Sequence, residues 1–235
     1  MASRDFADRC PSRIYGRFSR PRGWGALIAL SLTVSLSATA LATLFGTALG
    51  TGLAIYAVPG RRILVMTANA LLGLPPVVVG LALYLLLSRS GPLGVLDLLF
   101  TPGAMVIAQA LLALPIVTTL VHDATADSWA EYGAALQVDG ATRLQSIPHL
   151  LAIARTRLVM AVLAGFGRTI SEVGAILIVG GNIAGYTRTI TTAIVLETSE
   201  GNLSLALGLG FVLIGISIAV GATIFALGIK GGRWW

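Results

Sequence analysis

Residues 201–229 read GNLSLALGLGFVLIGISIAVGATIFALGI and contain no charged side chain. About 20 consecutive apolar residues are enough to cross the hydrocarbon core of a bilayer as a helix. Further charge-free runs of at least that length cover residues 23–60, 63–88 and 98–121. A fifth apolar run, at about 158–179, is interrupted only by Arg168 and Glu172. The sequence therefore predicts an all-α integral membrane protein with about five transmembrane helices.

The composition supports this class and excludes others. Hydrophobic residues make up 56% of the 235 residues and charged residues 11%, which is more apolar surface than a soluble domain of this length can bury. The apolar runs are continuous, whereas the strands of a β-barrel are alternating segments of about ten residues. The single cysteine, Cys10, excludes an intramolecular disulfide and a cysteine-rich metal site. His122 and His149 have no second ligand type beside them, so we interpret both as interfacial and expect no metal site.

We divide the chain into a basic N-terminal tail (1–24), a transmembrane domain (25–229) and a short C-terminal tail (230–235). The basic tail holds six arginines, Arg4, Arg9, Arg13, Arg17, Arg20 and Arg22. Beside a membrane span, such a tail suits anionic lipid headgroups better than nucleic acid. An alternative is the n-region of a signal peptide with a cleavage site at residues 38–40, but the apolar run continues well past Ala40.

Prolines interrupt two of the apolar runs. Pro75 and Pro76 lie in the second run and Pro115 in the third. A proline removes a backbone donor and kinks a helix, which a membrane protein tolerates where neighbouring helices or a cavity cover the freed carbonyls. We therefore predict helix kinks at these positions.

The only long polar stretch, residues 122–157, separates the third run from the fourth. It is too polar to cross a membrane and too short to form a domain. Trp129, Gly133 and Leu136 are spaced i, i+4 and i+7, which predicts a short amphipathic helix. Gly140 then permits a turn, and a second helix is expected from about Ala141.

This stretch resembles the signature loop of ABC-importer permeases, which reads Glu-Ala-Ala, three residues, then Gly. Ala135 and Gly140 match the second and seventh places of that motif. Ala134 stands in the first place, where the family usually has glutamate, and the nearest glutamate lies three residues earlier. The resemblance implies a cytoplasmic coupling helix between the third and fourth spans, which contacts an ATPase through Glu131, Ala134, Ala135, Gly140 and Ala141.

Other stretches are similar to the permease subunits of tungstate importers, relatives of the molybdate permeases. They are NALLGLPPVVVG (69–80), SRSGPLG (88–94), GFGRTISEVGAILIVGGNIAGYTRT (165–189) and LETSEG (196–201), and the similarity covers about residues 27–228. It implies a homodimeric channel in the inner (plasma) membrane, two cytoplasmic ATPase subunits that bind ATP and Mg, and an extracytoplasmic oxyanion-binding protein. The chain itself has no Gly-x-x-x-x-Gly-Lys-Ser/Thr phosphate loop, so we expect no cofactor and no catalytic residues in it.

Two interpretations of the intramembrane charges stay open. Arg168 and Glu172 are four residues apart, so on one helix they share a face and can pair. The pairing lowers the cost of placing charges in a membrane, which is one sufficient reason for both residues. Alternatively, Arg168 gives positive potential to the path of a divalent oxyanion, and Glu172 fixes its orientation.

The expected topology conflicts with the distribution of arginines. If the signature loop is cytoplasmic, five spans place the N-terminus outside and the C-terminus inside. The arginine-rich tail then lies outside, against the preference of basic residues for the cytoplasmic side. A tail that folds back, a misassigned start or a sixth membrane element would each resolve the conflict.

Three functions compete at this stage. The first is the permease of an ATP-driven oxyanion importer, most consistent with tungstate, with molybdate or another small anion as alternatives. The second is an ion-gradient-driven secondary transporter, which predicts internal repeats and intramembrane acids, whereas the chain shows no convincing repeat and one such acid beside an arginine. The third is a membrane scaffold, which gives no reason for kinked spans.

Overall fold

The computed structural model describes residues 21–56 and 59–229, and these residues form helices, turns and loops without a strand. Residues 1–20, with most of the predicted basic tail and Cys10, and the predicted C-terminal tail lie outside the described residues. The helices are α1 (Pro21–Ile55), α2 (Arg61–Ala70), α3 (Pro76–Leu87), α4 (Pro102–Val138), α5 (Arg143–Ile153), α6 (Arg155–Ile170), α7 (Gly174–Gly180), α8 (Ile190–Ser199) and α9 (Leu203–Ile229). The predicted all-α class is confirmed.

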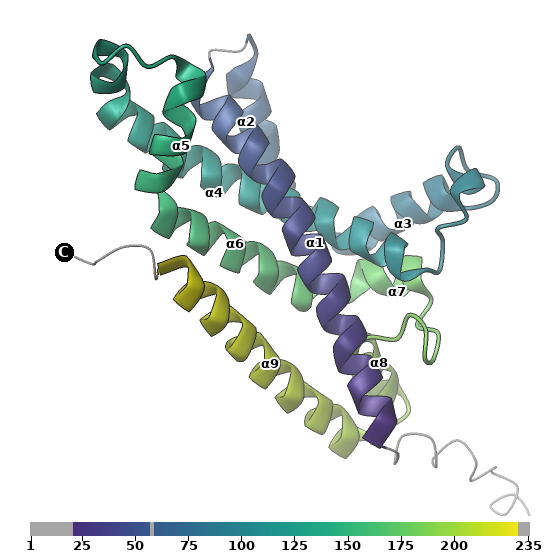
Figure 1. Cartoon of the computed structure of the whole chain (residues 1–235). Helices are drawn as coiled ribbons and strands as arrows, with labels where there is room; N and C mark the ends of the chain where they lie inside the picture. The colour runs from purple at the N-terminus through teal and green to yellow at the C-terminus, as the bar shows by residue number, and fades with distance from the viewer. Residues whose placement is uncertain (1–20, 57–58, 230–235) are drawn as a thin grey trace, which may run out of the picture.

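The two long helices α1 and α4 form the centre of the molecule and cross along their length (Figure 1). They run in the same direction, because Val34 of α1 and Met105 of α4 belong to one core cluster, and Gly50 approaches Thr118 further along both helices. The chain must therefore cross back between them. It does so through α2 and α3.

The return segment is a broken helix. The axes of α2 and α3 meet at 103°, and a 3-10 turn (Leu71–Gly73) joins them. Pro75 is the N-cap of α3 and Pro76 its first residue, a position where a helix needs no backbone donor. The predicted kink within one helix is thus a complete break at this point.

Helix α4 runs without interruption from Pro102 to Val138, through Pro115. The prediction of a span that ends near residue 121 and a separate short amphipathic helix is therefore wrong. The residues after Val121 are polar, but up to the turn at Gly140 they contain no proline and a single glycine, Gly133, so nothing stops helix propagation before that turn. The residues after Val121 are polar, but the helical backbone continues through them.

The fourth predicted segment is also divided. Helix α6 ends at Ile170, and α7 begins at Gly174 after a short connection that contains Glu172. Helix α7 packs against α3, where Gly80 lies directly beside Ala175. Two broken segments, α2–α3 and α6–α7, therefore lie together in this part of the bundle.

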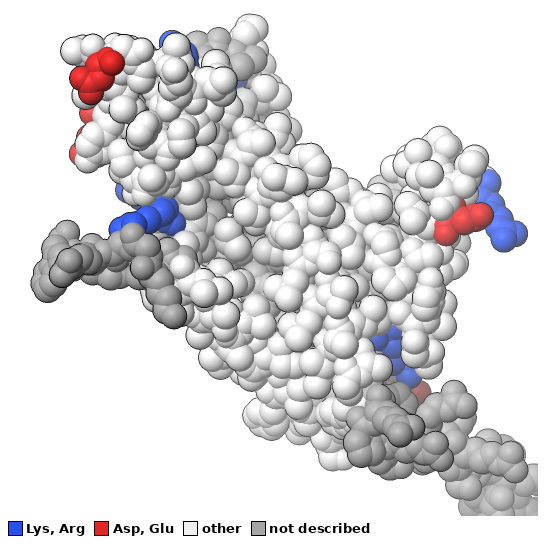
Figure 2. Space-filling view, viewed as in Figure 1, with Lys and Arg blue, Asp and Glu red and all other residues white. Residues whose placement is uncertain are grey.

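Helix α8 is an apolar element that the sequence did not predict. It packs against α9 and the beginning of α1, in a cluster formed by Leu27, Ile190 and Leu209. Three helices, α1, α4 and α9, are long and apolar enough to cross a membrane. The number rises to five if each of two bent pairs is one span, α2 with α3 (103°) and α5 with α6 (76°). Figure 2 shows an almost charge-free middle with basic and acidic side chains toward the ends of this face, as a membrane protein requires.

The molecule has two ends, which we name by a glycine in each. The Gly140 end holds the last turn of α1, the first turn of α2, the end of α4 and α5. The Gly91 end holds the loop between α3 and α4, the end of α7 and the loop between α7 and α8. The N–H of Phe100 in the first loop donates to the carbonyl of Val179 in α7.

Candidate functional site

A tight turn at Gly140 separates α4 from α5. Gly140 has a φ of +84°, a conformation that glycine adopts without a steric penalty, and the N–H of Ala141 donates to the carbonyl of Leu136. Helix α5 then begins with a capping box, in which Thr142 and Gln145 satisfy each other's backbone N–H groups. The predicted turn at Gly140 and the helix that follows it are confirmed.

The turn projects apolar side chains into solvent. Val138 is 87% exposed and Leu144 is 68% exposed, on either side of Gly140. Four of the residues that the signature loop singled out are exposed beside them, Glu131, Ala134, Ala135 and Gly140, and Ala141 is half-buried. We call Ala134, Ala135, Val138, Gly140 and Leu144 the Gly140 surface. Such a mixed apolar and polar tip suits contact with another protein.

Arg143 ties this turn to the rest of the bundle. Its Nη1 donates to the carbonyl of Ile55 at 2.7 Å, which satisfies one of the free carbonyls at the end of α1. Its guanidinium also lies 5.9 Å from the ring centroid of Trp129 on α4. Beneath it, the buried side chains of Ile55 and Leu150 join α1 to α5. A movement of α5 therefore reaches α1 and α4 together.

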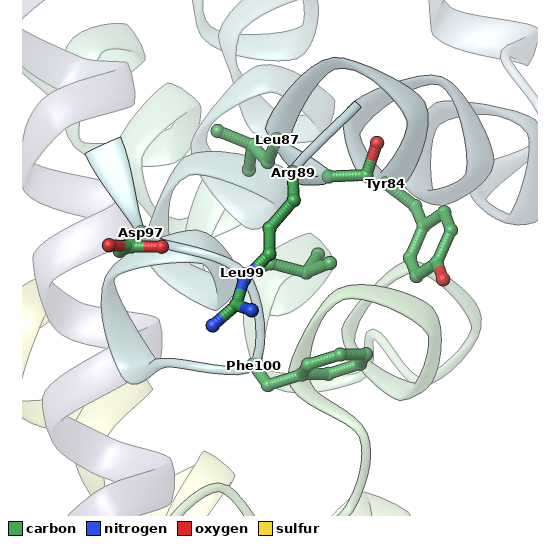
Figure 3. A pocket seen from close by; sticks show the side chains of 7 residues that line it. Tyr84, Leu87, Arg89, Asp97, Leu99 and Phe100 are labelled. Atoms are coloured by element: carbon green, nitrogen blue, oxygen red, sulfur yellow. The ribbon is translucent and has the colours of Figure 1, made fainter. Parts of the chain in front are cut away.

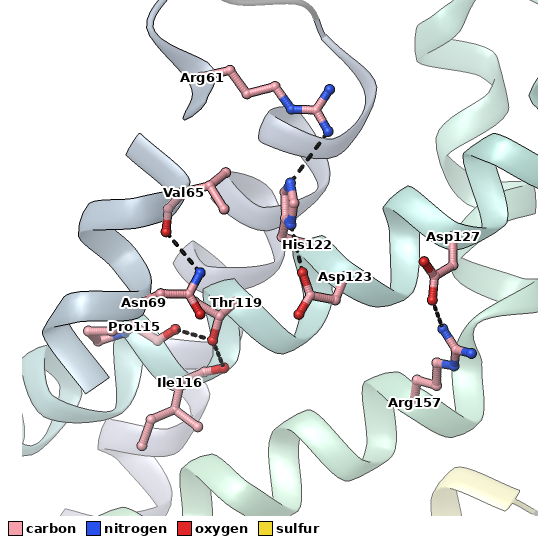
Figure 4. A network of polar contacts seen from close by, with 10 residues as sticks. All are labelled: Arg61, Val65, Asn69, Pro115, Ile116, Thr119, His122, Asp123, Asp127 and Arg157. Atoms are coloured by element: carbon pink, nitrogen blue, oxygen red, sulfur yellow. Dashed lines mark hydrogen bonds and ion pairs between the residues drawn. The ribbon is translucent and has the colours of Figure 1, made fainter. Parts of the chain in front are cut away.

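Polar contacts connect the neighbouring helices at the same end (Figure 4). His122 on α4 contacts Arg61 of α2 through Nε2 at 3.5 Å and Asp123 through Nδ1 at 2.9 Å. Arg157 of α6 pairs with Asp127 of α4. In the part of the chain that the structure describes, no three His, Cys, Asp or Glu side chains are grouped to hold a metal ion.

The intramembrane charges meet at the break between α6 and α7. Nη1 of Arg168 lies 3.4 Å from Oε2 of Glu172, so the predicted ion pair is confirmed. The prediction that both residues lie on one helix is wrong, because α6 ends at Ile170. Glu172 Oε1 instead accepts a hydrogen bond from the N–H of Ala175 at 3.1 Å, which satisfies one of the free N–H groups at the start of α7. The side chain of Glu172 is 2% exposed and that of Arg168 29%.

Polar groups from three other helices surround this break. Thr191 at the start of α8 donates to the carbonyl of Glu172 at 3.2 Å. Gln109 on α4 donates to the carbonyl of Thr169 at 2.9 Å, and its Oε1 is buried without a partner among the described residues. The Thr169 hydroxyl lies 2.9 Å from that of Thr39 on α1. Buried polar networks of this kind fix a specific arrangement, here one that joins α1, α4, α6, α7 and α8 at a single level.

Comparison with known proteins identifies the family. The chain is 42% identical over 167 residues to the tungstate uptake system permease protein TupB of Peptoclostridium acidaminophilum, which covers 71% of this chain and 73% of the relative. It is 38% identical over 202 residues to a probable anion ABC transporter permease protein of Haloferax volcanii, which covers 84% of this chain and 87% of the relative. The chain belongs to the family of ABC permeases for oxyanion uptake. A putative molybdenum transport system permease protein of Bacillus subtilis is 33% identical over 57% of the permease and 62% of the relative. No family model matches the permease.

The permease is thus a multi-pass inner-membrane subunit of an ABC uptake system. Sequence reasoning missed three of its contact residues, Arg143, Gln109 and Thr191. Polar residues inside apolar runs were the available signal for Gln109 and Thr191. The contact of Arg143 with α1 had no such signal, because it joins residues that are distant in the sequence.

Proposed function

We propose that the permease transports tungstate as the membrane subunit of an ATP-driven importer. The observation that carries this proposal is its 42% identity to a tungstate uptake permease, against 33% identity to a molybdenum permease. Tungstate and molybdate are both tetrahedral dianions, so the permease needs only a path that accepts this shape and charge. Selection between them lies mainly with the binding protein.

The Gly140 surface is the proposed contact with the ATPase, and the Gly140 end therefore faces the cytoplasm. Val138 and Leu144 supply apolar contact, and Arg143 passes the movement of α5 to α1 and α4. Rigid helices that are joined in this way move as one body when a partner rotates them. In this orientation α1 begins outside and α9 ends inside.

The proposed path passes the break at Glu172. Arg168 supplies positive charge there, and Glu172 neutralises part of it, so a dianion is attracted but not retained.

A second copy of the permease completes the path. Helix α9 carries an apolar stripe at helical spacing that no described residue covers: Leu207, Phe211, Ile214 and Ile218, each at least 57% exposed. One face of α9 thus remains available for a twofold-related copy. In a cysteine-free background, cysteines at these four positions should form disulfide-linked dimers in the assembled transporter. Absence of cross-links at all four positions would count against this interface.

Replacing Arg143 with leucine should uncouple ATP hydrolysis from transport. The variant loses the hydrogen bond to Ile55 and the contact with Trp129, so α5 no longer moves α1. We expect normal retention of the ATPase in pull-down, with stimulation of hydrolysis by loaded binding protein reduced about tenfold or more, since a hydrogen bond to a charged group contributes roughly 1.5–3 kcal/mol.

The matched control is Arg62→Leu, which removes the same charge from an exposed position at the same end. The Arg62→Leu variant should show the same stimulation of ATP hydrolysis by loaded binding protein as the parent. If Arg143→Leu also retains full stimulation, Arg143 is not part of the coupling route.

The substrate is tested by competition. Cells that lack their own tungstate and molybdate importers and express the permease with its ATPase and binding protein should accumulate labelled tungstate. Unlabelled tungstate should compete most strongly, followed by molybdate and then sulfate. Uptake that sulfate inhibits as strongly as tungstate would contradict the proposed substrate.

A further inference from the structure

The loop between α3 and α4, residues 88–101 at the Gly91 end, is held rigidly against the end of α3. The N–H of Leu93 donates to the carbonyl of Leu86 at 3.0 Å, and the N–H of Gly91 to the carbonyl of Ser88 at 2.8 Å. A Cβ at Gly91 would collide with the carbonyl oxygen of Leu85, so this part of the loop rests directly on the helix. The loop is a preformed surface, which binds a partner at a low entropic cost.

This surface contains a pocket of about 600 Å³. Its lining includes Tyr84, Leu87, Arg89, Asp97, Leu99 and Phe100 (Figure 3). In Figure 3 the guanidinium of Arg89 extends into the space between Asp97 and Phe100. Among the described residues no ion pair joins Arg89 to Asp97 or to another acid. The pocket therefore presents one cation and one anion, each free to pair with an incoming group.

Three apolar side chains beside the pocket are exposed to solvent. Val95 is 93% exposed, Leu96 56% and Leu93 45%. Val95 and Val138 are the two most exposed of the large hydrophobic side chains in the described chain, and they occupy opposite ends of the molecule. A small apolar contact with charged neighbours has the composition of a protein interface, with an apolar centre and a polar rim.

The loop is also connected to the helix break. The N–H of Phe100 donates to the carbonyl of Val179 in α7 at 2.8 Å, and the Phe100 ring lies against Gly181. At the other end of α7, the side chain of Glu172 accepts the N–H of Ala175. A partner that shifts this loop therefore shifts α7 and the ion pair at its start.

We infer that residues 88–100 form the seat of the extracytoplasmic binding protein, with an acidic side chain of that protein paired with Arg89 inside the pocket. A basic group opposite Asp97 and an apolar contact on Val95 complete the interface. The two unpaired charges of opposite sign fix the register, because a rotated partner would place like charges together. The inference rests on the proposed function, since it assigns a surface to a partner of the importer.

The test uses the complete transporter in nanodiscs and the tungstate-loaded binding protein. We expect Arg89→Glu and Val95→Asp each to weaken binding about tenfold or more. The first variant places like charges in contact, and the second places a charge in the apolar contact. Arg62→Glu reverses an arginine at the opposite end and should bind as the parent does. Retention of the ATPase and its basal hydrolysis rate verify that each variant is folded. A scan of surface acids on the binding protein, each changed to lysine, should contain one change that restores binding to Arg89→Glu.

The outcomes separate this inference from the proposed function. If the parent complex binds the loaded protein and both variants bind equally well, the seat is wrong and the importer assignment stands. If binding is unchanged but native mass spectrometry shows that Arg89→Glu loses a bound phospholipid, the pocket holds a lipid headgroup and the inference is likewise overturned. If the parent binds no loaded binding protein, the proposed function fails first.

Discussion

Changing Glu172 to glutamine should sharply reduce the amount of folded permease in the membrane. The amide can still accept the hydrogen bond from Ala175, but Arg168 loses the carboxylate 3.4 Å away. Removing one partner of a buried ion pair costs about 3–5 kcal/mol. We expect a loss of stability near the lower limit of this range, because the Arg168 side chain is 29% exposed. Thermal unfolding in detergent, followed by size-exclusion chromatography, measures the loss.

Two double variants separate the roles of Glu172. Arg168→Leu combined with Glu172→Gln should recover most of the stability, since no unpaired charge remains. Arg168→Leu combined with Glu172→Leu should recover less, because α7 also loses the hydrogen bond to the N–H of Ala175, which contributes about 1 kcal/mol. A single Glu172→Gln variant as stable as the parent would contradict the stabilising role of the ion pair.

The recovered double variant also distinguishes the two interpretations of the charges. If Arg168 serves only to neutralise Glu172, the folded double variant transports tungstate at the parent rate. If Arg168 attracts the dianion into the path, the same variant folds but transports poorly. We expect the second result, because part of the Arg168 side chain stays exposed beside the break.

Changing Gly50 to valine should prevent α1 from packing on α4. A Cβ at Gly50 would lie 2.6 Å from the carbonyl oxygen of Thr118 and 2.9 Å from the backbone nitrogen of His122, so a larger side chain meets backbone that cannot rotate away. Overpacking of a close contact costs about 1–3 kcal/mol, and we expect the upper limit or more because these two helices form the centre of the bundle. The measurement is the yield of monodisperse permease after membrane extraction.

Gly52→Val is the matched control on the same helix. No described atom lies within 4 Å of the Cβ that this substitution adds. The intrinsic helix propensities of the two variants are equal, so any difference reports the contact with α4. Equal yields of the two variants would show that α1 and α4 do not approach each other at Gly50.

Apolar runs were sufficient to predict the class and the approximate spans. Residues 201–229 and α9 (Leu203–Ile229) agree closely, because nothing in that run competes with a single long helix. The turn at Gly140 was also predictable, since a local glycine signal and the actual backbone conformation coincide there.

The helix breaks depended on contacts that the sequence does not display locally. The apolar run at 158–179 gave no reason to end α6 at Ile170, and the break is held by Gln109, Thr39 and Thr191 from three other helices. The opposite error occurred in α4. The change to polar residues after Val121 suggested that the helix ends there, but it continues to Val138. Helix α8 was missed because the run at 190–199 is too short to be recognised as a span.

Transport by the purified complex in proteoliposomes decides whether the permease forms the path of an ATP-driven oxyanion importer. The permease is reconstituted with its ATPase, labelled tungstate is supplied on the binding protein at the opposite face, and ATP and Mg are supplied on the ATPase side. We predict accumulation of tungstate on the ATPase side that stops when ATP, the ATPase or the binding protein is omitted, and that persists when ionophores abolish all ion gradients. Accumulation that proceeds without ATP and collapses with the ion gradient would instead identify a secondary transporter and overturn the importer assignment.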